Sequence, residues 1–161
     1  MLTNTTYGSD YWQTIDAFKV TGSLLNFSQA VTAKWSKFAL LSFSGSHWNG
    51  GANPDDLSGG HWWNGTAGES VSWTFSGKTL ITAWGRPDVE NGVTNVYLDG
   101  VLIKSISLRY GSIDNDSTNN SATFFAVKVS TAPHTIKLSP TGSSDGGKGL
   151  NYLQFDQFAA W

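Results

Sequence analysis

A turn at Asp99-Gly100 constrains the fold of this chain more than any other sequence feature. It separates the strand-like run 93–98 from a second run at 101–108. A two-residue type I′ turn needs positive φ at both central residues, and Asp-Gly is one of the pairs that tolerate this backbone. The sequence therefore predicts an antiparallel hairpin formed by these two runs.

The rest of the second half of the chain also has the pattern of strands. In segment 70–76, apolar Val71, Trp73 and Phe75 alternate with Ser and Thr, which predicts a strand with one buried face and Trp73 in the core. Further strand-like runs occupy 79–85, 121–130, 134–139 and 152–158. Polar or Gly-rich loops at 109–120 and 141–149 separate some of them. Short strands at this spacing predict an all-β sandwich.

The first 69 residues are harder to interpret. Segment 13–20 resembles a strand, whereas 24–43 fits a helix or a strand equally well. Segment 46–69 is rich in both glycine and aromatic residues, and we expect it to form a loop because so much glycine disfavours strands and helices.

Composition excludes several classes of protein. The length of 161 residues predicts one domain, 1–161. A formal net charge of −2 with 14% charged residues gives no basic surface for nucleic acid. The chain has no Cys, which excludes thiol catalysis and thiolate metal sites. It also shows no secretory signal and no apolar run long enough for membrane insertion.

Catalytic motifs are weak. The P-loop pattern fails at Gly77-Lys78-Thr79 because Ser72 stands where its first Gly belongs, and the three His residues form no zinc signature. The loop around Asp114 lacks the Gly and Glu of an EF-hand, although a calcium site built on loop carbonyls stays open. Several carboxylates could form a glycosidase pair, but no pair is marked, and capping of turns explains them better.

Aromatic residues carry the functional signal, because the chain has eight Trp. Sugars offer flat C–H faces and a rim of hydroxyls, which an indole face and nearby amides, carboxylates or guanidinium groups can bind. Trp48, Trp62 and Trp63 lie in the Gly-rich segment and are candidates for such contacts. The alternative is that they plug the open end of the sandwich.

A second cluster follows the run 79–85. Trp84 ends this run, and Arg86 and Asp88 follow it, so a ring, a guanidinium and a carboxylate lie within one turn. We interpret this cluster as part of a sugar site. The alternative is a core Trp next to a surface Arg–Asp pair.

Four segments resemble carbohydrate-binding modules of families 6 and 35, which have a galactose-binding-like, antiparallel jelly-roll β-sandwich fold. They are the entry strand at 68–77, the hairpin at 95–102, the strand at 134–138 and the closing strand at 152–158. The resemblance covers about residues 66–160 and implies that the chain is a non-catalytic module.

The resemblance also implies site residues. In such modules the sugar stacks on an aromatic residue that corresponds to Trp84 and lies beside an Asn that corresponds to Asn151. A second aromatic residue of the sugar clamp is missing near position 120, so Tyr110 or the Trp62–Trp63 pair would replace it. Related modules often hold a structural calcium ion, for which Asp156 would be a ligand, although a buried Asp bonded to backbone amides explains this residue better.

The expected function is recognition of a polysaccharide, such as a cell-surface or cell-wall glycan, without a required cofactor. The expected context is a larger extracellular or virion-associated assembly, such as an enzyme, a wall protein or a phage tail. Two alternatives stay open, namely a glycoside hydrolase or lyase domain and a protein–protein adhesion module.

Overall fold

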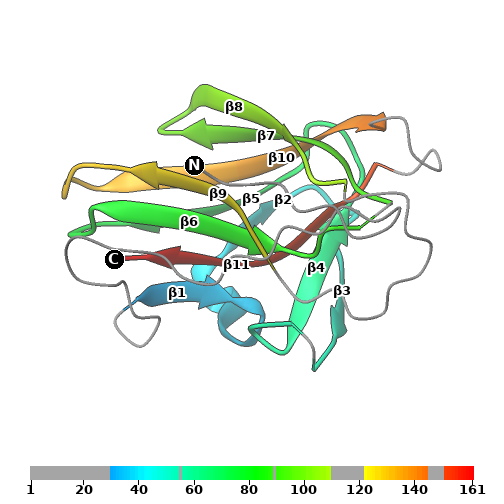
Figure 1. The fold of residues 1–161 in the computed structure, drawn as a ribbon, viewed down its shortest axis with the longest axis horizontal. Helices are drawn as coiled ribbons and strands as arrows, with labels where there is room; N and C mark the ends of the chain where they lie inside the picture. The colour runs from blue at the N-terminus through cyan, green and yellow to red at the C-terminus, as the bar shows by residue number, and fades with distance from the viewer. Residues whose placement is uncertain (1–29, 55, 89, 110–121, 145–150) are drawn as a thin grey trace, which may run out of the picture.

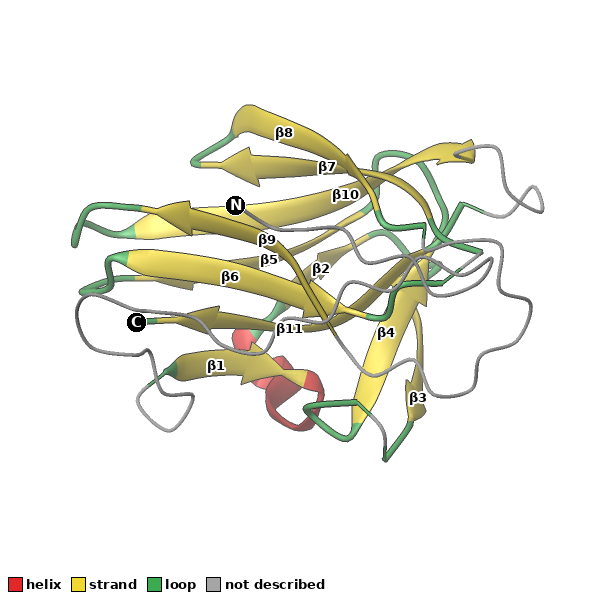
Figure 2. Ribbon diagram, in the orientation of Figure 1, coloured by secondary structure: helices red, strands yellow, loops and turns green. Residues whose placement is uncertain are grey.

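The computed structural model of the chain describes residues 30–54, 56–88, 90–109, 122–144 and 151–161, which form two antiparallel sheets (Figure 1). Strands dominate these ranges, and the helical element among them is a short 3-10 helix, η2, at Trp35–Leu40 (Figure 2). The fold is the predicted antiparallel jelly-roll β-sandwich. In the described ranges, no helix is long and apolar enough to cross a membrane.

The first sheet has six strands in the order β3-β4-β11-β6-β9, and β1 pairs with β11 beside this path. Its strands are β1 (Val31–Lys34), β3 (Asn49–Ala52), β4 (Gly60–Asn64), β6 (Leu80–Gly85), β9 (Ala122–Lys128) and β11 (Leu153–Ala160). Strand β11 is central, because it bonds β6 on one edge and both β1 and β4 on the other.

The second sheet has five strands in the order β2-β5-β10-β7-β8. Its strands are β2 (Ser42–Ser44), β5 (Ser70–Phe75), β7 (Gly92–Leu98), β8 (Val101–Ser107) and β10 (His134–Ser144). Strand β10 extends past the run expected at 134–139, because Pro140 pairs with Thr94 and, beyond an irregularity, Ser144 pairs with Gly92.

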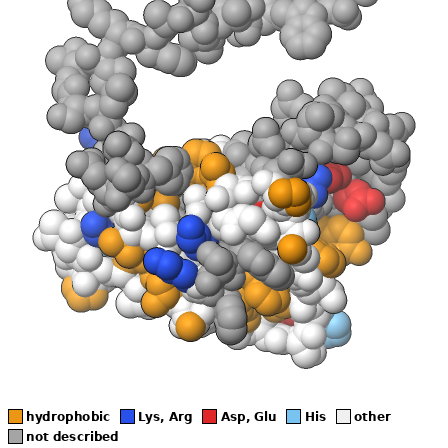
Figure 3. Space-filling model, turned by 90° about the horizontal axis from the view of Figure 1, so that it is seen from below, with side chains coloured by type: hydrophobic (Ala, Val, Ile, Leu, Met, Phe, Trp, Pro, Cys, Tyr) orange, Lys and Arg blue, Asp and Glu red, His pale blue; other side chains and the backbone are white. Residues whose placement is uncertain are grey.

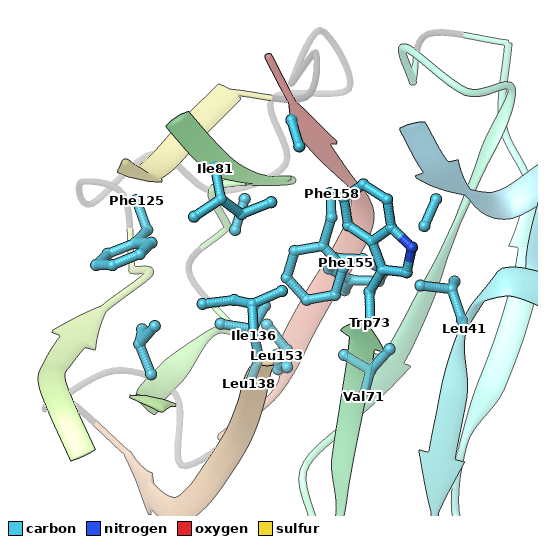
Figure 4. Close-up of a cluster of buried hydrophobic side chains, with 14 of the residues drawn as sticks. Leu41, Val71, Trp73, Ile81, Phe125, Ile136, Leu138, Leu153, Phe155 and Phe158 are labelled. Carbon is cyan, nitrogen blue, oxygen red and sulfur yellow. The ribbon is translucent and has the colours of Figure 1, made fainter. Parts of the chain in front are cut away.

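The core lies between the two sheets and is built from side chains of both (Figure 4). The alternation predicted for β5 is confirmed: Val71, Trp73 and Phe75 are buried, whereas Thr74 is exposed. Facing them from the first sheet are Ile81 and residues of β11 such as Phe158, whose ring stacks on Trp73 at a centroid distance of 6.4 Å. Trp73 is therefore a core residue, as predicted.

The predicted hairpin joins β7 to β8. Asp99 has φ of 52° and Gly100 has φ of 81°, which are the signs that a type I′ turn requires. The Asp99 carboxylate also accepts hydrogen bonds from the Thr135 amide at 2.8 Å and from His134 Nδ1 at 2.7 Å. These two bonds hold the pKa of Asp99 below its usual value, and they attach the turn to β10.

The expectation for the Gly-rich segment 46–69 was wrong, because β3 and β4 lie within it. Strand β3 is an edge strand whose register places Gly50 opposite Trp62 and Gly51 opposite His61. Edge pairing supplies the backbone hydrogen bonds, and the absence of a side chain at Gly51 leaves space for the Trp63 ring of β4. In segment 24–43, the described part forms β1, η2 and the start of β2. The strand expected at 13–20 lies outside the described residues.

Candidate functional site

A surface groove of about 440 Å³ lies where β3 and β4 meet the loop that follows β6. Its lining combines an indole, a phenol, an imidazole, a guanidinium, two carboxylates and two amides. The lining residues are Gly51, Ala52, Asn53, Pro54, His61, Trp63, Arg86, Asp88, Glu90, Tyr152 and Gln154. We call this feature the Trp63 groove.

The register of β4 against β11 explains why Trp63 reaches this groove. Trp62 pairs with Phe155, whereas Trp63 pairs with Gln154. Successive side chains of a strand point to opposite faces of the sheet. Phe155 is fully buried and Trp62 packs against the core, so Trp63 points to the opposite, outer face.

Gly51 and His61 fix the surroundings of the Trp63 ring. A Cβ atom at Gly51 would lie 3.3 Å from Cζ3 of Trp63, so the indole rests against bare backbone of β3. The His61 ring, two residues earlier on the same face of β4, lies at a centroid distance of 5.5 Å from Trp63 and an angle of 47°. The indole is therefore held by its neighbours before any ligand binds.

His61 is held in turn by Asp56, from the turn between β3 and β4. His61 Nδ1 lies 2.7 Å from Asp56 Oδ2, and the Asp56 side chain is fully buried. Because Nδ1 is engaged by this carboxylate, Nε2 is the ring nitrogen that faces a contact in the groove.

Backbone hydrogen bonds fix the loop that carries the charged lining residues. The Arg86 amide donates to the Gln154 carbonyl at 3.2 Å, and the Tyr152 amide donates to the Glu90 carbonyl at 3.1 Å. The buried Asn91 side chain bridges the two ends of the loop, since its Nδ2 donates to the Arg86 carbonyl at 2.6 Å. Arg86 and Glu90 are thus positioned by contacts outside their own charged groups.

A close approach of β6 to β11 places Arg86 at the rim of the groove. A Cβ atom at Gly85 would lie 2.0 Å from the Gln154 carbonyl oxygen, so the Trp84-Gly85-Arg86 sequence needs glycine at its centre. Trp84 itself is half-buried, and its Nε1 donates to Thr82 Oγ1 at 2.8 Å.

A carboxylate-centred cluster next to β4 supports the end of that strand. Glu69 accepts hydrogen bonds from Asn64 Nδ2 at 2.6 Å, from His47 Nδ1 at 2.6 Å and from the amides of Ser46 and His47. The hydrogen bond from the His47 ring is the main cause that lowers the pKa of Glu69 to about 2. A Cβ atom at Gly45 would overlap Glu69, so glycine is needed there.

The structure brings together residues from the two clusters found in the sequence. Trp63 from the Gly-rich segment lines the same groove as Arg86 and Asp88. Trp84 lines neither this groove nor the second pocket described below. Tyr110 lies outside the described residues.

Trp48 and Trp62 occupy positions that match the alternative of a plug at the end of the sandwich. Both pack against the core. Phe43 lies between them, with ring-centroid distances of 5.1 Å to Trp48 and 5.0 Å to Trp62. Asn151 does not line the groove; its Nδ2 donates to the Gly142 carbonyl at 2.8 Å, which ties the start of β11 to β10.

Eight residues that line the groove were not predicted as site residues: Gly51, Ala52, Asn53, Pro54, His61, Glu90, Tyr152 and Gln154. A signal for two of them is present in the sequence, because Tyr152 and Gln154 lie two positions apart in the predicted closing strand and so share a face. The pairing of this face with Trp63 depends on long-range register, which one sequence does not reveal.

The face of the molecule seen from below is mixed in character. Seen from below, Asp and Glu side chains gather near one edge of the molecule, where hydrophobic and basic side chains also reach the surface (Figure 3). Such a mixture of apolar and hydrogen-bonding groups suits a polar ligand with apolar faces.

The described residues do not provide a complete set of metal ligands. No group of three His, Asp or Glu side chains in these ranges lies close enough to hold a metal ion. Asp156 is fully buried and its Oδ1 accepts a hydrogen bond from the Ser58 hydroxyl. The described residues around Asp156 thus form no group of three such side chains that could hold calcium, which takes six to eight oxygens.

Comparison with known proteins shows the fold. No protein-family model matches the sequence, and no curated protein matches it significantly. The CBM36-1 domain of a multidomain xylanase from the hindgut metagenome of Trinervitermes trinervoides superposes with a TM-score of 0.54 at 17% identity, over 83% of this chain and 97% of that one. A family 35 carbohydrate-binding module from Clostridium thermocellum has a TM-score of 0.55 at 13% identity, over 83% and 98%.

A third solved structure is a CBM36 carbohydrate-binding module in complex with calcium and xylotriose. Its TM-score is 0.51 at 15% identity, over 83% of this chain and 99% of that one. These identities are low, so the similarity concerns the arrangement of the strands. The chain therefore has the galactose-binding-like jelly-roll fold that these carbohydrate-binding modules share.

Proposed function

We propose that this chain is a non-catalytic module that binds an oligosaccharide or polysaccharide in the Trp63 groove. The observation that carries the proposal is the joint lining of this groove by the Trp63 indole, the Arg86 guanidinium and the Asp88 carboxylate. An indole packs on the C–H face of a sugar ring, while the charged groups bind its hydroxyls. The volume of about 440 Å³ lies within the usual range of ligand sites.

Weak binding at each site fits the proposed context. We expect a Kd on the order of 10 µM to 1 mM for a single site, and tighter attachment through several linked modules. The module would act as the glycan-binding part of a larger extracellular or virion-associated assembly, on a cell-surface or cell-wall polysaccharide. The xylanase-derived neighbour, which is one domain of a multidomain protein, supports such an arrangement.

The same groove also favours one alternative, a glycoside hydrolase or lyase. Asp88 and Glu90 both line it, and two carboxylates beside one sugar are what hydrolysis requires. Against this alternative, Asp88 Oδ1 accepts a hydrogen bond from the Glu90 amide at 3.0 Å, which gives Asp88 a role in shaping the loop. Release of new reducing ends from a bound polysaccharide would support the enzyme.

A glycan array followed by titration calorimetry tests the proposal. We expect binding of at least one glycan by the wild type, loss of binding in Trp63→Ala, and no release of reducing ends. Absence of binding to every glycan would overturn the proposal, and capture of a protein that free sugar does not displace would support the adhesion alternative. Repeating the titration with EDTA shows whether binding needs calcium.

A further inference from the structure

A second pocket, of about 270 Å³, shares Arg86 with the Trp63 groove. It lies at the end of the sandwich, where the ends of β6 and β8 meet the start of β9. Its lining residues include Arg86, Arg109, Pro87, Leu108 and Phe124. We call it the Arg86–Arg109 pocket.

The charge of this pocket differs from that of the groove. Two guanidinium groups line it and none of the described residues that line it is acidic, whereas Asp88 and Glu90 line the groove beside it. The chain as a whole carries a formal net charge of −2. The pocket is thus a local positive site on a weakly acidic protein.

Among the described residues, no carboxylate forms an ion pair with the Arg86 guanidinium. Its Nε is buried and has no hydrogen-bond partner in the described part of the chain. The ion pairs found there join His47 to Glu69, His61 to Asp56 and His134 to Asp99, so none involves Arg86. A buried N–H of a charged group without an acceptor is costly, and a bound anion would remove that cost.

The apolar part of the lining limits what kind of anion fits. Phe124, Leu108 and Pro87 contribute hydrocarbon surface beside the two guanidinium groups. A free inorganic ion gains no binding energy from this hydrocarbon surface. A sugar ring with a negatively charged substituent gains binding energy from both the apolar and the charged lining. Its C–H groups pack on Phe124, while a guanidinium fork binds the anion with two parallel hydrogen bonds.

We propose that the Arg86–Arg109 pocket binds the anionic substituent of an acidic glycan whose neighbouring sugar occupies the Trp63 groove. The inference rests on the proposed function and narrows its ligand to glycans that carry carboxylate, sulfate or phosphate groups. Arg86 lines both sites and so connects the two sugars.

Titration calorimetry with matched glycan pairs tests this assignment. The pairs are oligogalacturonate with its methyl ester, a glucuronate-containing xylan oligosaccharide with the reduced neutral form, and a sulfated galactan oligosaccharide with unsulfated galactan. We expect one acidic member to bind at least tenfold tighter than its neutral partner, with a preference that weakens as salt rises. Inorganic sulfate serves as a competitor, to distinguish binding of an anion alone from binding of an acidic sugar.

The variants Arg109→Gln and Arg109→Lys report on the pocket without changing the groove. Arg109→Gln should remove the preference for the acidic member and leave binding of the neutral member unchanged. Arg109→Lys should keep part of the preference for the acidic member. The matched control is Lys104→Gln on the exposed edge strand β8, which should behave as the wild type. Melting temperatures show that each variant is folded.

The outcomes separate the two proposals. If no acidic glycan binds better than its neutral partner, or if Arg109→Gln keeps the preference, the assignment of the pocket is wrong. Binding of neutral glycans that is lost in Trp63→Ala would still support the groove as a sugar site in that case. If inorganic sulfate competes as well as the acidic sugar, the pocket is a simple anion site and the assignment is overturned.

Discussion

Trp63 lies directly opposite Gln154 in the ladder between β4 and β11, while its neighbour Trp62 lies opposite Phe155. Because of this register, the two adjacent tryptophans point to opposite faces of the sheet and have different roles. Trp62 packs against the core, and Trp63 lines the groove. A shift of β4 by one residue would exchange them, because every side chain of a strand then changes face.

Replacing the two tryptophans one at a time tests this separation. Trp63→Ala should lower the free energy of sugar binding by about 1–3 kcal/mol, as for other aromatic anchors of binding sites, and change the melting temperature little. Trp62→Ala should instead lower the free energy of unfolding by about 2–4 kcal/mol, because truncation leaves a cavity next to Phe43 and Phe155. Calorimetric titration and thermal unfolding of both variants measure the two effects.

The opposite pattern would contradict the register. If Trp63→Ala unfolds at a much lower temperature and Trp62→Ala loses sugar binding while staying stable, Trp62 is the ligand-facing residue. A double variant is not needed, because each single variant is the control for the other.

Gly51 offers a milder perturbation of the same indole. In Gly51→Ala the new Cβ would lie 3.3 Å from Cζ3 of Trp63, so the ring must move by a few tenths of an ångström. We expect a two- to fivefold weaker affinity with little change in stability, since φ at Gly51 is not positive. Gly68→Ala is the contrasting variant, because its φ is 82° with open space around it, and it should lose stability but keep affinity.

The strands of the second half of the chain could be predicted because local patterns specify them. Alternation in β5 and the Asp99-Gly100 turn each depend on a few neighbouring residues, and both are confirmed. Strands β3 and β4 could not be predicted in this way. Their glycines disfavour a strand locally. The pairing of β4 with β11, nearly a hundred residues away in the sequence, and of β3 with β4 overrides that preference.

The candidate site also combines features that local sequence predicts with features that depend on long-range contacts. Residue type was enough to mark Trp63, Arg86 and Asp88 as candidates, because indole, guanidinium and carboxylate groups suit a sugar. Their meeting in one groove depends on contacts between segments far apart in the sequence, such as the hydrogen bond from the Arg86 amide to the Gln154 carbonyl. His61 could not be recognised because its orientation depends on the buried Asp56.

Replacing Trp84 tests whether the bound sugar extends beyond the Trp63 groove. The sequence places this residue at the centre of the site, whereas in the structure its ring lines neither the groove nor the Arg86–Arg109 pocket. We therefore expect Trp84→Ala to bind the groove ligand within about twofold of the wild type, with a lower melting temperature because the hydrogen bond to Thr82 and part of the packing are lost.

A large loss of affinity in folded Trp84→Ala would reverse this expectation. It would place the sugar over the ring of Trp84, as the family resemblance implies. Trp84→Phe then distinguishes stacking from hydrogen bonding, because Phe keeps an aromatic face and removes the Nε1 donor.

Glu69 should make stability depend on pH in the acid range. Its pKa in the folded chain is about 2, below the ordinary value of 4.5, mainly because His47 Nδ1 donates a hydrogen bond to its carboxylate. A carboxyl group with a lowered folded pKa stabilises the fold fully above its unfolded pKa and loses that contribution as pH falls toward the folded pKa. The contribution of Glu69 should thus be complete above about pH 5 and decline between pH 4.5 and 2.

Urea unfolding of wild type and Glu69→Gln at pH 7, 4, 3 and 2 measures this contribution. We expect the variant to be less stable at pH 7, and the difference between the two proteins to shrink steadily as pH falls to 2. His47→Ala should shift the decline to higher pH, because it removes the hydrogen bond that lowers the pKa most. A difference that stays constant from pH 7 to pH 2 would show that Glu69 acts through packing against Gly45 and its neighbours, and that the charge of its carboxylate does not stabilise the end of β4.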